Sequence, residues 1–151
     1  MSQVSNTRKV PLTITVRTKE PLSLEAYVNL VSVVKESVGI IPESIKVDVP
    51  TDRVINLVSS LESEGVTARE VTPMGTPDLV AQWITLIITV HAAAEILEPH
   101  VKIVIDALTT KVKELRDKKT NNEKINKDNP VRIVIASPQM EKPQVVKIGD
   151  E

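Results

Sequence analysis

The chain has 151 residues, which favours one compact domain with tails, and 41% of them are hydrophobic, enough for an independent core. Its 19 Lys and Arg residues nearly balance its 20 Asp and Glu residues, so nucleic-acid binding driven by overall charge is not expected. The absence of cysteine excludes disulfides, a thiol nucleophile, iron–sulfur clusters and every cysteine-based zinc site.

The N-terminal residues 1–8 are polar and lack the apolar run of a signal peptide. We therefore expect a flexible N-terminus and a cytoplasmic protein, with residues 1–151 forming a single domain.

Two strand–helix units are predicted in the first 65 residues. Apolar and polar side chains alternate over 11–18, the period of a strand with one buried face. A helix then runs from an N-cap at Ser23 to Gly39, with apolar residues at steps of three and four. The pattern repeats as a strand over 42–50 and a helix over 51–65. A third extended segment, 66–72, is predicted to be an edge strand because charged residues interrupt it.

The next segment, 79–94, contains no Asp, Glu, Lys or Arg. Gln82, Thr85 and Thr89, together with Asp78, recur at steps of four, three and four. This spacing predicts an apolar helix over 78–97 with one thin polar stripe. We expect such a helix to be buried in the domain, and the alternatives are an oligomer interface or conditional insertion into a membrane.

A second helix is predicted beyond Pro99, because proline disfavours helical geometry in the residue before it and is tolerated in a first turn. A single kinked helix is the alternative. Its apolar residues from Val101 to Leu115 mark one face, which should pack on the core. Its basic end belongs to a segment, 102–132, with nine basic and five acidic residues. This excess indicates a solvated helix end and loop, or contact with an acidic partner or an anionic surface.

The C-terminal part begins with the polar segment 117–130, which predicts a mobile loop. Strands over 131–136 and 144–148 follow and should form a hairpin. The predicted order is βαβαβααββ. It corresponds to an α/β (α+β) fold with a mixed sheet of about five strands and four helices packed on it.

Catalytic and metal chemistry find no support in the motifs. His91 and Glu95 would share one helical face, but a zinc site needs further ligands and no HExxH motif is present, while His100 points elsewhere. The four glycines are too scattered for a phosphate-binding loop, and no serine lies in a GxSxG motif. We therefore predict no enzyme activity, no catalytic or metal-binding residue and no cofactor. The candidate interaction residues lie on the apolar segment: Trp83, Ile84, Ile87, Ile88, His91 and Glu95.

One family resemblance follows from this order of elements. Residues 71–75, VTPMG, precede the apolar segment, then a helix with a basic end, the strand VRIVIA and a short last strand. The opening strand LTITVRT also fits. This arrangement resembles the effector-associated constant component family of bacterial conflict systems. The resemblance implies a small non-catalytic adaptor that couples a protein effector, such as a protease, a TIR-type enzyme or an NTPase, to other components.

Two functions therefore compete. The first is a cytoplasmic adaptor that docks an effector or self-associates. The alternative is a membrane-associated or conditionally pore-forming component that uses the apolar segment 79–97.

Overall fold

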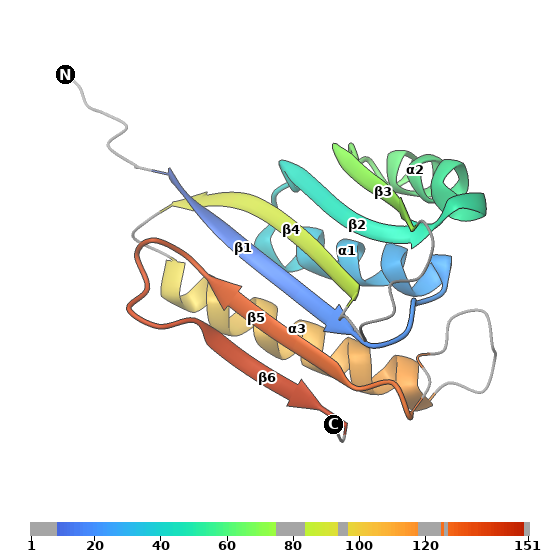
Figure 1. Cartoon of the computed structure of the whole chain (residues 1–151). Coiled ribbons are helices and arrows are strands. Elements are labelled where there is room, and N and C mark those ends of the chain that lie inside the picture. The colour runs from blue at the N-terminus through green and yellow to red at the C-terminus, as the bar shows by residue number, and fades with distance from the viewer. Residues whose placement is uncertain (1–8, 75–83, 94–96, 118–124, 126, 150–151) are drawn as a thin grey trace.

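The computed structural model describes residues 9–74, 84–93, 97–117, 125 and 127–149 (Figure 1). Its elements, in chain order, are β1 (Lys9–Thr18), α1 (Leu24–Val38), β2 (Ser44–Pro50), the 3-10 turn η1 (Thr51–Arg53), α2 (Val54–Ser63), β3 (Glu70–Met74), β4 (Ile84–Ala93), α3 (Leu97–Asp117), β5 (Val131–Ala136) and β6 (Gln144–Ile148). The strands form one six-stranded sheet in the order β3-β2-β4-β1-β5-β6.

The sheet is mixed. β4 lies between β1 and β2 and is antiparallel to both, while β5 is antiparallel to β1. In the unit β1-α1-β2, the two strands are separated by β4. In the unit β4-α3-β5, the two strands are separated by β1. A βαβ unit whose strands are separated in this way is called a split βαβ unit. Two strands extend this centre: β3 pairs with β2 in parallel, and β6 pairs with β5 in antiparallel.

The helices of the described residues all lie on one face of the sheet. α1 and α3 lie side by side behind the sheet, and α2 lies beside α1 near β3 (Figure 1). Alternate strand residues are buried beneath them; Ile14 of β1, for example, lies opposite Ile88 of β4, and both are fully buried. The core is aliphatic, with Tyr27 as its buried aromatic residue.

Local signals place the first helix as predicted. The Ser23 side chain accepts a hydrogen bond from the Ala26 N–H at 3.1 Å, which satisfies a donor at the open end of α1. Gly39 ends the helix with φ of +74°, a conformation that glycine adopts without the steric cost of a side chain.

The predicted mixed α+β sheet is confirmed, but the numbers of elements are corrected to six strands and three α-helices among the described residues. The main error is the helix predicted over 78–97, because residues 84–93 form β4 in the middle of the sheet. Six of the seven residues in ITLIITV are β-branched, and such side chains lose rotamer freedom in a helix and pack well in a sheet. Polar residues four apart also fall on one face of a strand, since four is a multiple of two.

The second predicted helix is present as α3, with Pro99 in its first turn. The terminal hairpin of β5 and β6 is confirmed as well.

Part of the predicted mobile loop 117–130 packs on the domain. Residues 118–124 and 126 lie outside the described residues, as does the predicted flexible segment 1–8. Ile125, however, is 1% exposed, and its N–H donates to the Leu115 carbonyl at 3.0 Å. Asn129 is 2% exposed. The expectation of a wholly solvated loop therefore does not hold at these two residues.

Candidate functional site

The sheet face opposite the helices, called the open face below, carries a flat row of β-branched side chains. Strand register places Thr15 of β1 between Ile87 of β4 and Val134 of β5. The row continues to Lys46 of β2 on one side and to Val145 of β6 on the other. The three central residues are half-buried and the two outer ones are exposed. No helix lies over this face in the described part of the chain (Figure 1).

Basic side chains lie beside this row. The register places Arg17 of β1 opposite Arg132 of β5, and Arg132 opposite Lys147 of β6. Like charges directly opposite each other in a sheet are unfavourable, and Arg132 and Lys147 each make a further interaction in the structure. Arg17 is exposed.

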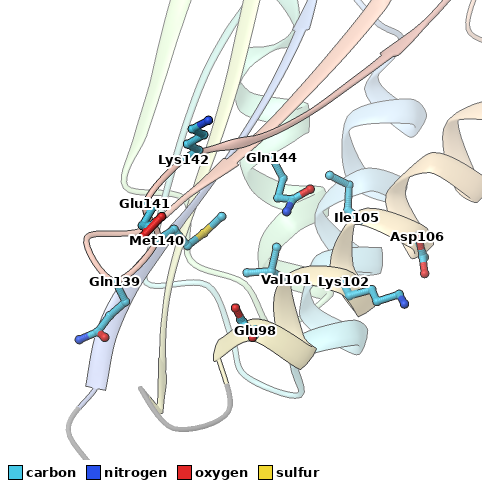
Figure 2. Close-up of a pocket in the computed structure, with 10 residues that line it drawn as sticks. All are labelled: Glu98, Val101, Lys102, Ile105, Asp106, Gln139, Met140, Glu141, Lys142 and Gln144. Atoms are coloured by element: carbon cyan, nitrogen blue, oxygen red, sulfur yellow. The ribbon is translucent and has the colours of Figure 1, made fainter.

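A groove lies on the other side of the sheet, between α3 and the turn that joins β5 to β6. Its volume is about 1020 Å³. Val101 and Ile105 of α3 line one wall, and Met140 and Gln144 line the other (Figure 2). Carboxylates and lysines alternate around its rim, without a histidine or hydroxyl group that could act as a nucleophile.

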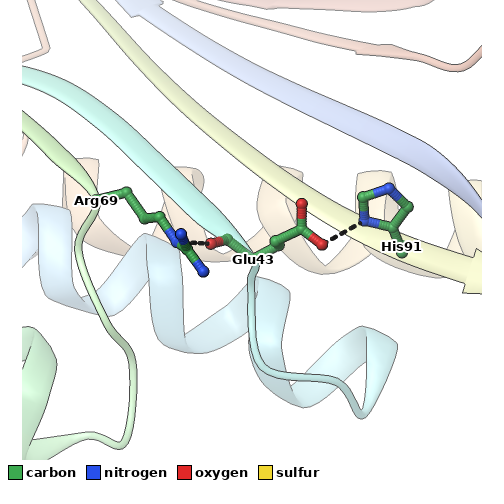
Figure 3. Close-up of polar contacts among 3 residues, drawn as sticks. All are labelled: Glu43, Arg69 and His91. Atoms are coloured by element: carbon green, nitrogen blue, oxygen red, sulfur yellow. Dashed lines mark hydrogen bonds and ion pairs between the residues drawn. The ribbon is translucent and has the colours of Figure 1, made fainter.

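His91 lies on the open face and contacts the loop before β2. Its Nδ1 is 2.9 Å from Oε2 of Glu43 (Figure 3), which is an ion-pair distance without hydrogen-bond alignment. The Glu43 backbone is held on both sides: its N–H donates to the Thr89 carbonyl at 2.8 Å, and its carbonyl accepts from Arg69 Nε at 2.9 Å. These contacts fix the loop against β4.

The six candidate interaction residues are only partly brought together. Ile87 and His91 lie on the open face, and Ile84 is half-buried at the start of β4. The prediction that Ile88 is an interaction residue is corrected, because its side chain is fully buried beneath the helices. Neighbouring residues of a strand point to opposite faces, so Ile87 and Ile88 cannot share the open face. Trp83 and Glu95 lie outside the described residues. The helical face predicted to join His91 and Glu95 is also wrong, since His91 belongs to a strand.

Sequence reasoning missed the contributions of β1 and β5 to this surface. The alternation of Thr13, Thr15 and Arg17 in LTITVRT shows that these residues share one face, and VRIVIA shows the same for Arg132 and Val134. What the sequence does not show is that β4 lies beside β1, about seventy residues away along the chain.

Within the described ranges, histidine and acidic side chains form no group of three that could hold a metal ion. Nor does any helix in the described part of the chain combine the length and apolar character needed to span a bilayer. No family model, curated protein or solved structure matches this chain.

Proposed function

We propose that this chain is a non-catalytic adaptor that binds a protein effector of a prokaryotic conflict system through the open face of its sheet. The observation that carries the proposal is the half-buried row of Ile87, Thr15 and Val134 on a sheet face without helices. The family resemblance supplies the class of partner.

The physical character of the open face suits protein binding. β-Branched side chains are stiff at χ1, so little rotamer entropy is lost when a partner covers them. Arg17 is exposed at one end of this face, and its charge favours an acidic patch on the partner. Single-stranded nucleic acid is a poorer fit, because bases stack on aromatic side chains and this row has none.

The membrane alternative has no comparable support. It required an apolar helix over 79–97, but the described residues 84–93 pair on both sides with β1 and β2. Inserting this segment in a bilayer would break these strand pairs and leave the facing backbone groups of β1 and β2 without their partners. We therefore keep the adaptor as the proposed function.

The experiment is a binding assay with matched isoleucine variants. Each protein encoded beside the gene is purified and titrated against the chain by calorimetry. Ile87→Lys, on the open face, should weaken effector binding by about tenfold or more, as expected for a charge buried in an interface. Ile55→Lys on α2 is the control, since Ile55 is 78% exposed and lies away from the open face.

Both variants are checked for unchanged thermal melting, and Thr15→Lys serves as a second open-face variant if Ile87→Lys melts early. Equal affinities for the native chain and for folded open-face variants would contradict the proposal. So would binding that only Ile55→Lys abolishes.

A further inference from the structure

The two edges of the sheet differ in their capacity to add a strand. Edge strands present backbone groups without a partner, and proteins commonly protect them with proline or charge. β3 contains Pro73, which has no N–H to donate, and begins with Glu70. β6, QVVKI, contains no proline, and its Val145 is 50% exposed. Of the two edges of the sheet formed by the described residues, β6 is therefore the one better suited to pair with another strand.

The groove shown in Figure 2 lies directly beneath the start of β6. Gln144 lines it together with Val101, Ile105 and Met140. Ile105 and Met140 are half-buried, and so is Val146, the middle residue of β6. The helical layer thus leaves apolar side chains partly uncovered beside the open edge. A strand added to β6, with a helix behind it, would cover them.

Among the described residues that line the hollows at the two ends of β6, the net charge is weakly negative at one end and positive at the other. At the Gln144 end, the groove is lined by the acidic Glu98, Asp106 and Glu141 and the basic Lys102 and Lys142. At the Ile148 end, a smaller hollow of about 280 Å³ is lined by the basic Lys113, Arg116 and Lys127 and the acidic Asp117. α3 runs alongside β6 from the acidic end to the basic end.

We infer that β6 pairs with β6 of a second copy of this chain, in antiparallel orientation about a two-fold axis. Such an axis places the acidic end of each copy beside the basic end of the other, so the same complementary contact forms twice. An extended segment of an unrelated protein would need its own charges to match this pattern, whereas a second copy has them. The pairing does not depend on effector binding.

Geometry also selects the register. In one continuous sheet, residues opposite each other must point to the same face, so the two-fold axis passes through a residue of β6. An axis at Val146 pairs all five residues of the strand. It also places Lys147 opposite Val145 of the second copy, whereas an axis at Lys147 would place the two lysines opposite each other. The open faces of both copies then lie on the same side of one sheet.

A single-cysteine experiment tests this register, because the native chain has no cysteine. Val146→Cys places the two introduced thiols directly opposite each other, where Cβ atoms in antiparallel pairs are about 4.5–5.5 Å apart. Oxidation, or a short bis-maleimide, should convert most of the protein to a covalent dimer. Ile55→Cys, on exposed α2, is the control and should remain mostly monomeric.

Light scattering of the native chain, without crosslinking, should give twice the mass of one chain at micromolar concentration. Because the charges are reciprocal, Asp106→Lys and Lys113→Glu should each weaken the dimer by about tenfold, and the double variant should recover much of the loss. A native chain that stays monomeric, with Val146→Cys crosslinking no faster than Ile55→Cys, would overturn the inference. A dimer that crosslinks only through another position would overturn it too. Neither result would bear on effector binding through the open face.

Discussion

Two reciprocal hydrogen bonds join the side-chain amide of Asn129 to the backbone of Glu20. Asn129 Oδ1 accepts from the Glu20 N–H at 3.0 Å, and Asn129 Nδ2 donates to the Glu20 carbonyl at 3.0 Å. The same oxygen also accepts from the Lys19 N–H at 2.9 Å. This side chain, 2% exposed, fastens the turn after β1 to the segment before β5.

Replacing Asn129 should therefore destabilise the fold. Asn129→Ala removes the acceptor of two backbone N–H groups, while the Glu20 carbonyl keeps its hydrogen bond from the Thr18 hydroxyl at 2.8 Å. The substitution should lower the free energy of unfolding by about 1–3 kcal/mol. Urea denaturation measures the change. Asn56→Ala, at an exposed position of α2, is the control and should change stability by less than about 0.5 kcal/mol. Equal effects of the two substitutions would show that the Asn129 bonds contribute nothing.

Ile125 offers a second test of the same segment. Because this side chain is 1% exposed, Ile125→Ala should leave a cavity and lower the unfolding free energy by about 2–4 kcal/mol. The matched substitution Ile55→Ala, at an exposed site, should have little effect. If both variants unfold at the same urea concentration, the segment before β5 does not contribute to the core.

The two neighbouring isoleucines of β4 should respond very differently to substitution. Ile88→Thr buries a hydroxyl in the core and should cost about 2–4 kcal/mol of unfolding free energy. Ile87→Thr keeps a β-branched residue on the open face, beside Thr15, and should cost less than about 1 kcal/mol. In a strand, consecutive side chains point to opposite faces of the sheet, so the two losses should differ. Similar losses in both variants would therefore contradict the strand.

Tyr27 gives a prediction of pH dependence. Its hydroxyl donates to the Asp48 carbonyl at 3.3 Å and accepts from the Leu22 N–H at 3.4 Å. Burial raises the pKa of this hydroxyl to about 12, from 10.0. The folded state thus holds its proton more tightly than the unfolded state. This contribution to stability is complete below pH 10 and falls between about pH 10 and 12.

Tyr27 is the chain's single tyrosine, so the ultraviolet absorbance of phenolate reports its ionisation without overlap from another tyrosine. Tyr27→Phe should remove this part of the alkaline loss of stability, while the part due to lysine titration remains. Ionisation of the folded protein near pH 10 would contradict the proposed effect of burial.

The sequence predicted the first half of the fold well because its signals are local. Ser23 and Gly39 mark both ends of α1, and the alternation in LTITVRT marks β1. The segment around Ile87 was misread because Thr85 and Thr89 fit one face of a strand as well as one face of a helix. Its β-branched composition was the signal that could have decided between them.

The candidate site could be predicted only in part. Ile87 and His91 were named on the assumption of a helix, and they lie on the open face because alternate residues of β4 point there. Thr15 and Val134 complete the row through pairings between strands that are distant in the chain. Local patterns show which residues share a face of one strand, but they do not show which strands are neighbours.

Protection of a thiol on the open face would show whether the effector binds there. Thr15→Cys and Ile55→Cys each introduce one thiol into a chain that has none, and maleimide labelling rates are measured with and without the bound effector. The effector should slow labelling of Thr15→Cys by about tenfold, since interface cores exclude water, and should leave the labelling rate of Ile55→Cys unchanged. A complex that forms while Thr15→Cys is labelled at its free rate would contradict effector binding through the open face.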